Sequence, residues 1–247
     1  MFSRTLTEKH FILEIYEISS GVSGEPLTVL LVKQRETLEY FAGCRTKVGV
    51  SFEYIDIGGR QKLNGDGIFS GAHSFQGSLH YREDGHNIAS ISSLQAEGGN
   101  IFIRNSDLRG QHIGTFFIDK IIAWLKKEAG DDIFLMKPLR LTTTDYQANN
   151  GKNGARRNQL YINFGFKIKI NDVNCSNSDE VYLSELKNRR TWERNLVEVD
   201  LVDYSKGIHI HNKRMALTIK NLQAGKKGYK IALQTALLVI ILLTVFI

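Results

Sequence analysis

The chain has 247 residues, of which 42% are hydrophobic and 23% are charged, so a disordered or collagen-like protein is excluded. Two cysteines, Cys44 and Cys175, are too few for a disulfide framework or a four-cysteine zinc site, and we expect no metal site. The formal net charge is +6, of which half lies in residues 226–247, whereas residues 1–225 hold 29 basic against 26 acidic side chains, a balance of only +3. The main body is therefore close to neutral, and we expect no nucleic-acid partner.

The first quarter of the chain, residues 1–65, is predicted to be a strand-rich N-terminal portion of the domain. Short strand-like runs occupy His10–Ile18 and Val48–Ile57, and a candidate helix lies around Gln34–Phe41. Glycines at positions 58, 59, 65 and 67 then mark a loop, because glycine adopts turn conformations without strain.

Three short runs in the middle of the chain predict an antiparallel meander. They are Phe75–Arg82, Ile88–Leu94 and Asn100–Asn105, and turn signals at Asp84-Gly85 and Gly98-Gly99 separate them. Runs of this length joined by Asp-Gly and Gly-Gly pairs are typical of consecutive hairpins.

The next elements alternate between helix and strand. Gly114–Ala129 predicts a helix, because its apolar residues recur at helical spacing and lysines occupy its last turn. Leu139–Thr143 predicts a buried strand, Ala155–Phe164 a second helix and Phe166–Ile170 another strand. A helix between the third meander strand and Leu139–Thr143 would make those two strands parallel. Residues 66–222 are therefore expected to form an α+β domain with a mixed, mostly antiparallel sheet and flanking helices.

The C-terminal run 231–247 carries no charge and predicts one C-terminal transmembrane helix as part of the fold class. At about 1.5 Å per residue it spans about 26 Å, close to the thickness of a bilayer core of about 30 Å. The preceding segment, 223–230, carries Lys226, Lys227 and Lys230 and is expected to be a basic juxtamembrane segment. We therefore expect a single-pass membrane protein with its N-terminal domain in the cytoplasm and the lipid bilayer as partner of 231–247. The alternative is a C-terminal helix buried in the core or in an oligomer.

Two motifs carry a resemblance to a known family. The segment LRGQHIG at Leu108–Gly114 lies between the third predicted strand and the long helix. It resembles the acyl-CoA-binding turn of the GNAT superfamily of N-acetyltransferases, although His112 stands where that family usually has glycine. The segment LYINFGF at Leu160–Phe166 resembles the later signature of the same family. The resemblance covers about residues 75–170 and implies a GNAT-like fold with acetyl-CoA as co-substrate.

The turn before the long helix is the expected cofactor-binding site. A strand-to-helix turn presents unpaired backbone N–H groups at the positive end of a helix dipole, which suits a diphosphate. Glycine lets the backbone approach such a ligand closely. The residues expected to bind acetyl-CoA are Arg109, Gly110, Gln111, His112, Ile113, Gly114 and Thr115. The alternative is a glycine-containing turn that only joins a strand to a helix.

Tyr161 is the leading catalytic candidate, because in the family the matching tyrosine often protonates the departing CoA thiolate. The alternative is that Tyr161 is an aromatic core residue. The general base is less well defined, and Glu97 is chosen over Asp107 and His112, which remain open.

These observations favour a membrane-anchored, acyl-CoA-dependent N-acyltransferase that transfers an acetyl group to an unknown amine by direct attack. Acetyl-CoA would lie in the split between the third meander strand and Leu139–Thr143. An alternative is a catalytically degenerate GNAT-fold protein that acts as a membrane-tethered interaction module, and His112 and the long Thr142–Gln159 connection favour it. A third is a β-rich module that binds lipid surfaces.

Overall fold

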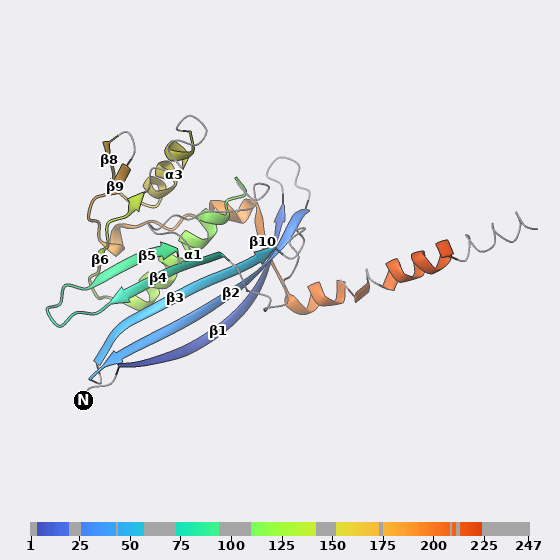
Figure 1. The fold of residues 1–247 in the computed structure, drawn as a ribbon, viewed down its shortest axis with the longest axis horizontal. Coiled ribbons are helices and arrows are strands. Elements are labelled where there is room, and N and C mark those ends of the chain that lie inside the picture. Colours follow the sequence, from blue (N-terminus) through green and yellow to red (C-terminus); the bar gives the residue numbers. More distant parts are fainter. Residues whose placement is uncertain are drawn as a thin grey trace, which may run out of the picture. The chain divides into compact units, whose positions relative to one another are not determined.

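The computed structural model describes residues 4–19, 26–42, 44–56, 73–93, 110–141, 152–172, 175–207, 209–210 and 213–223 (Figure 1). The chain divides into two units, Met1–Val199 and Asp200–Ile247, and each is described by itself. The first unit holds a seven-stranded sheet, a three-stranded sheet and the helices between them. The expected α+β class with a mixed, mostly antiparallel sheet is thus observed.

Three long antiparallel strands begin the first unit. They are β1 (Arg4–Ser19), β2 (Pro26–Phe41) and β3 (Cys44–Asp56). The helix expected around Gln34–Phe41 is wrong, because these residues continue β2 and pair with both neighbouring strands. The charged residues of this stretch find partners in the fold. The Glu36 carboxylate, for example, accepts a hydrogen bond of 2.7 Å from the indole N–H of Trp124. Pairing along two strands outweighs the local helical preference of this segment.

The sheet continues through β4 (His73–His80) and β5 (Ile88–Ser93), which form a hairpin as predicted. It ends in β6 (Leu135–Met136), which pairs in parallel with β5, while β10 (Leu196–Val199) lies beside β1 at the opposite edge. The expected parallel pair therefore exists, but it joins other strands than predicted. The third predicted meander strand, Asn100–Asn105, lies outside the described residues.

A smaller antiparallel sheet has the order β7 (Arg140–Leu141), β9 (Cys175–Ser178) and β8 (Ile168–Asp172). The predicted strand Leu139–Thr143 corresponds to β7, which belongs to this second sheet and not to the sheet of the meander. Helix α3 (Lys152–Asn163) precedes β8 and matches the predicted second helix. Two 3₁₀ turns, η2 (Leu183–Glu185) and η3 (Arg190–Arg194), lead back to β10.

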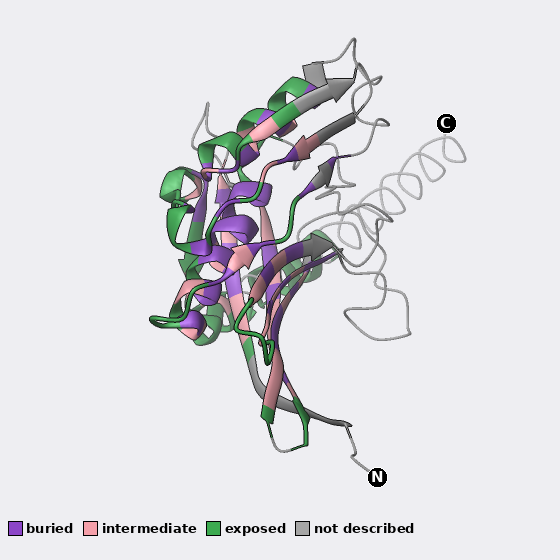
Figure 2. Ribbon diagram, turned by 90° about the vertical axis from the view of Figure 1, so that its left-hand side faces the viewer, coloured by how far each residue is buried: buried purple, intermediate pink, exposed green. Residues whose placement is uncertain are grey.

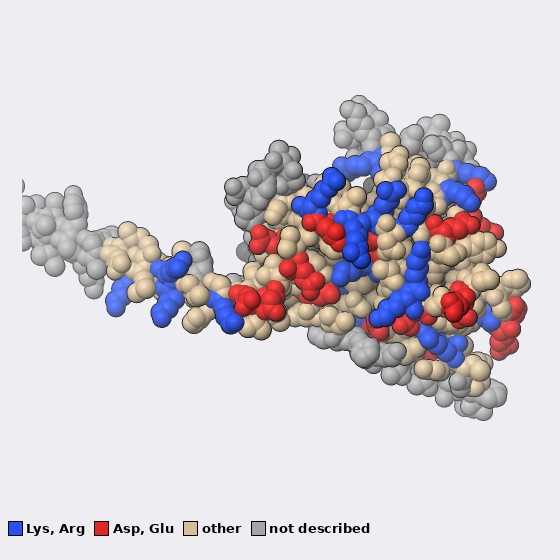
Figure 3. Space-filling view, turned by 180° about the vertical axis from the view of Figure 1, so that it is seen from behind, with Lys and Arg blue, Asp and Glu red and all other residues tan. Residues whose placement is uncertain are grey.

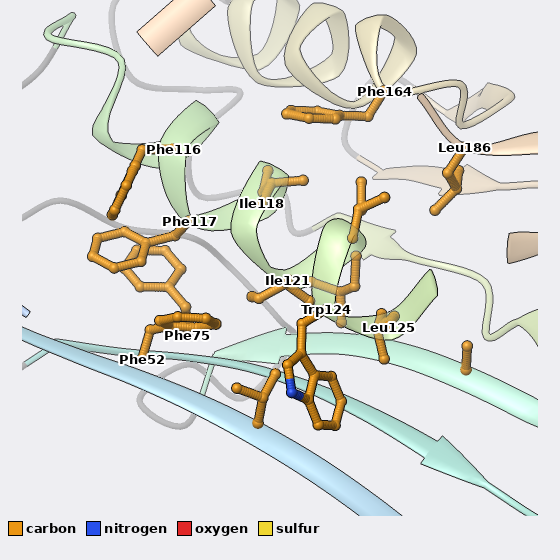
Figure 4. Close-up of a cluster of buried hydrophobic side chains, with 14 of the residues drawn as sticks. Phe52, Phe75, Phe116, Phe117, Ile118, Ile121, Trp124, Leu125, Phe164 and Leu186 are labelled. Carbon is orange, nitrogen blue, oxygen red and sulfur yellow. The ribbon is translucent and has the colours of Figure 1, made fainter. Parts of the chain in front are cut away.

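Helix α1 (Ile113–Ala129) is buried along most of its length and packs on the meander, which confirms the predicted helix (Figure 2). The rings of Phe75 on β4 and Phe117 on α1 stack with their centroids 4.4 Å apart (Figure 4). Gly77 on β4 lets the helix approach, because a Cβ at this position would lie 2.5 Å from the Cγ2 atom of Ile121. The core therefore depends on a close contact between α1 and β4.

The C-terminal transmembrane helix of the predicted fold class is wrong for the structure described. No helix among the described residues is long and apolar enough to cross a membrane. In the second unit the described helical segments are 201–207, 209–210 and 213–223. The predicted tail 231–247 and most of the predicted segment 223–230 lie outside the described residues, so the membrane localisation stays a prediction.

Candidate functional site

The candidate site lies where the parallel strands β5 and β6 stop pairing and separate. The amide of Lys137 donates a hydrogen bond of 2.7 Å to the carbonyl of Ala89, and this bond closes the parallel ladder. The N–H groups of Leu135 and Lys137 point toward β5 and that of Met136 points away to Val181, so the next donor of the ladder would be the N–H of Leu139, beyond Pro138. Leu139 then exchanges hydrogen bonds with Ser178 of the smaller sheet, at 2.7 and 3.0 Å. The chain thus leaves one sheet for the other at Pro138.

The edge of β5 beyond this point is free among the described residues. Since the carbonyl of Ala89 points toward β6, strand alternation places the N–H and C=O of Ile91 on the same edge. The pairing of β5 with β6 ends at Ala89, and β7 pairs with β9 instead. Ligands of α/β sheets bind at the carboxyl ends of strands where neighbouring strands diverge, and an extended ligand can pair with such an edge.

The turn before α1 contains two residues with a left-handed backbone conformation. Gly110 has φ of 86° and His112 has φ of 61°, both in the left-handed region. Glycine adopts this region without strain, whereas histidine does so at an energetic cost of about 1–2 kcal/mol. His112 therefore occupies a backbone conformation that favours glycine. Both residues are exposed, and the carbonyl of His112 accepts the N–H of Phe116 at 2.8 Å.

The other predicted cofactor residues are less accessible. The side chain of Gln111 accepts a hydrogen bond of 3.0 Å from the side-chain amide of Asn195, which also donates to the carbonyl of Ser19 at 3.2 Å. The first turn of α1 is covered, since Ile113, Gly114 and Thr115 are all buried. An anion from solvent would therefore meet the exposed turn Gly110–His112 first. Arg109 lies outside the described residues.

Tyr161 lies in the hydrophobic core between α3 and the smaller sheet. It is 2% exposed, and its ring meets the ring of Phe166 edge to face at 5.8 Å. Its backbone carbonyl accepts the N–H groups of Phe164 and Phe166. These contacts make Tyr161 part of the core, the alternative that its aromatic neighbours indicated. The predicted base Glu97 and its alternative Asp107 lie outside the described residues.

A buried carboxylate that the sequence analysis missed lies on α1. Asp119 on α1 is 5% exposed and accepts hydrogen bonds from the backbone N–H of Arg189 at 2.6 Å and from the indole N–H of Trp192 at 2.9 Å. Its role is to hold the segment of η3 against α1. An acid at a position where the helical periodicity expects an apolar residue is the sequence signal that could have revealed it.

A second missed cluster lies where α1 meets β1. The Tyr16 hydroxyl donates to a Glu14 carboxylate oxygen at 2.7 Å, and the Lys120 ammonium lies 3.5 Å from the same oxygen. Burial and the neighbouring Glu14 carboxylate raise the pKa of Tyr16 well above its usual value, so this phenol stays protonated. The cluster neutralises charge beneath the helix and contains no free base.

The face of the sheet opposite α1 carries a third polar cluster. Since Gly77 faces α1, its neighbour Ser78 and then His80 point the other way. The Ser78 hydroxyl lies 2.8 Å from the hydroxyl of Ser90 and 3.1 Å from Nε2 of His80. The pKa of His80 is lowered, mainly by burial, which favours the neutral form of the imidazole.

Comparison with protein-family models, with curated proteins and with solved structures yields no match. The candidate site is therefore argued from its own geometry and from the resemblance of its motifs.

Proposed function

We propose that this protein is an acyl-CoA-dependent N-acyltransferase that binds acetyl-CoA where β5 and β6 separate. The observation that supports this most is the end of the parallel ladder at Pro138, beside an edge of β5 that no described strand pairs with beyond Ala89. Parallel strands joined through a helix place the start of that helix at the carboxyl end of the first strand. The turn before α1 and the edge of β5 could then bind the diphosphate and the extended arm of the same ligand.

Each part of acetyl-CoA has a matching feature. The exposed turn Gly110–His112 would receive the diphosphate at the positive end of the α1 dipole. The amide-bearing arm would pair with the β5 edge at Ile91, in the manner of an added strand. The thioester would then lie near Pro138, where the chain of β6 leaves β5.

The chemistry follows from the ligand. A neutral amine attacks the thioester carbonyl, the C–N bond forms, and the C–S bond breaks to release CoA thiolate. The amine loses a proton to a base, for which Glu97 is the candidate. The thiolate gains a proton, for which Tyr161 is the candidate by resemblance. Because Tyr161 is buried, donation requires the sulfur to reach the core side of α3.

A second candidate function is favoured by specific observations, namely the burial of Tyr161 and the covered first turn of α1. Both features suit a catalytically degenerate scaffold that binds a protein partner. The two candidates differ in one measurable property, since only the enzyme needs to bind acetyl-CoA.

The test is calorimetric titration of the full chain with acetyl-CoA, CoA and ADP. If the arm pairs with the β5 edge, CoA binds at least tenfold more tightly than ADP, which lacks the arm. His112→Glu places a negative charge at the exposed turn and should weaken CoA binding at least tenfold. His86→Glu, in an exposed turn between β4 and β5, is the matched control. Absence of CoA binding to the folded chain would reject the enzyme and leave the scaffold.

Catalysis is tested separately on a chain that binds CoA. Tyr161→Phe keeps the ring that packs on Phe166 and removes only the hydroxyl. We expect CoA release with a panel of amine acceptors to fall at least tenfold while CoA affinity is unchanged. Unchanged release would remove Tyr161 from the mechanism.

A further inference from the structure

The second unit carries an unpartnered amphipathic helix at 213–223. Its apolar residues Met215, Ile219 and Leu222 are spaced by four and three positions and therefore share one face. They are 52%, 50% and 68% exposed, so no described part of the chain covers this face. Lys213 and Lys220 lie seven positions apart on the opposite face.

The net positive charge of the protein comes from the segment that contains this helix. The last acidic residue of the chain is Asp203, and residues 204–247 contain seven lysines and arginines. Residues 1–203 therefore hold 25 basic against 26 acidic side chains, a balance of −1. The described part of 204–223 shows blue side chains without red ones in Figure 3. The positive net charge of the protein thus belongs to this segment alone.

We propose that the helix 213–223 docks on an anionic lipid surface, with Met215, Ile219 and Leu222 inserted among the acyl chains and the basic residues at the headgroups. A helix with one apolar face and a basic polar face lies in the membrane interface. Anionic headgroups attract basic residues by about 1 kcal/mol each. Three further lysines, at 226, 227 and 230, follow in the sequence and add to this attraction.

The other possible occupants fit less well. A nucleic acid would satisfy the charge but would leave the aliphatic face in water. A second copy of the helix would bring like charges together across a stripe of only three residues, which is too short for a stable coiled coil. An isolated helix of this length is marginal in water, so a lipid surface also supplies the packing that the helix lacks.

The experiment measures partitioning of the full chain onto vesicles of phosphatidylcholine alone and of phosphatidylcholine mixed with phosphatidylserine. We expect a clear preference for the anionic vesicles that falls as salt is raised. The triple variant Lys213→Gln, Arg214→Gln, Lys220→Gln should lose about 100-fold in partitioning onto anionic vesicles, at about 1 kcal/mol per residue. These side chains are exposed, so the fold of the first unit is unaffected.

The matched control neutralises the same number of exposed basic residues in the first unit, with Lys127→Gln, Arg156→Gln and Lys187→Gln. It should change partitioning less than threefold. The apolar face is tested by Ile219→Ser against Leu217→Ser, since Leu217 is equally exposed but lies on the opposite face.

Two results would overturn the proposal. One is equal partitioning onto neutral and anionic vesicles, which would assign membrane binding to the apolar sequence 231–247. The other is an equal effect of the two triple variants. That result would show that partitioning depends only on the net charge of the protein and not on the helix 213–223. Capture of RNA by the wild-type chain, lost in the first triple variant without any vesicle preference, would assign the segment to nucleic acid instead.

Discussion

The first prediction concerns Asp119, whose carboxylate holds the segment of η3 against α1 next to the candidate site. Its carboxylate accepts three hydrogen bonds, from Arg189 N–H at 2.6 Å, from the Asn188 side-chain amide at 3.1 Å and from Trp192 Nε1 at 2.9 Å. Asn188 is exposed, so water can replace its partner, whereas the ring of Trp192 is half-buried and packs edge to face on Phe116. Removal of the carboxylate therefore leaves two donors without an acceptor.

The magnitude follows from these two donors. Hydrogen bonds to a charged group contribute about 1.5–3 kcal/mol each, so Asp119→Ala should lower the free energy of unfolding by about 3–6 kcal/mol. Asp119→Asn keeps one acceptor oxygen and should lose about half as much. The Asn195–Gln111 hydrogen bond lies at the end of the same segment, so a loosened η3 should also weaken ligand binding at the turn before α1.

The assay is urea unfolding of the full chain followed by tryptophan fluorescence. Asp131→Ala removes the same charge from an exposed turn after α1 and is the control, with an expected change below about 0.5 kcal/mol. If Asp119→Ala and Asp131→Ala unfold at the same urea concentration, the carboxylate does not hold η3 and the argument fails.

Two further predictions concern the sheet. Gly77→Ala places a methyl group 2.5 Å from the Cγ2 atom of Ile121, and the overpacking should destabilise the protein by about 1–3 kcal/mol in the same urea assay. Gly207→Ala, where a Cβ would have nothing within 4 Å, is the control, and equal stability of the two variants would contradict the close packing of α1 on β4. Burial lowers the pKa of His80 in the folded protein below its unfolded value of about 6.5, so stability should decline as the pH falls below that value. His80→Asn cannot take up the proton, and stability curves of the two proteins that stay parallel between pH 7 and pH 5 would show that His80 does not carry this dependence.

The elements whose signals are local were predicted correctly. The long helix Ile113–Ala129 was found because its apolar spacing, its terminal lysines and Gly130 all lie within one stretch of sequence. The β4–β5 hairpin was found because an Asp-Gly pair at Gly85 specifies its turn. Helix α3 was predicted to stop before Gly165, and the structure ends it two residues before that glycine, at Asn163.

The errors arose where distant residues decide the structure. Gln34–Phe41 has a helix-like composition, but β1 and β3 pair with it on both sides and make it a strand. The strand parallel to the meander was predicted at Leu139–Thr143, whereas the parallel partner of β5 is β6 and Leu139–Thr143 supplies β7 of the smaller sheet. The left-handed conformation of His112 was also hidden, since nothing in the local sequence requires it of a histidine.

The sequence by itself determined the bounds of the long helix to within one residue, the turn that precedes it, the hairpin of β4 and β5, and the position of the positive charge at the C-terminal end. Only the tertiary structure decided which strands meet, that the chain changes sheets at Pro138, and that Tyr161 and Asp119 are buried. The physical reason is range. Helical periodicity, turns and charge are properties of neighbouring residues, whereas strand pairing and burial depend on side chains that are brought together from distant parts of the chain.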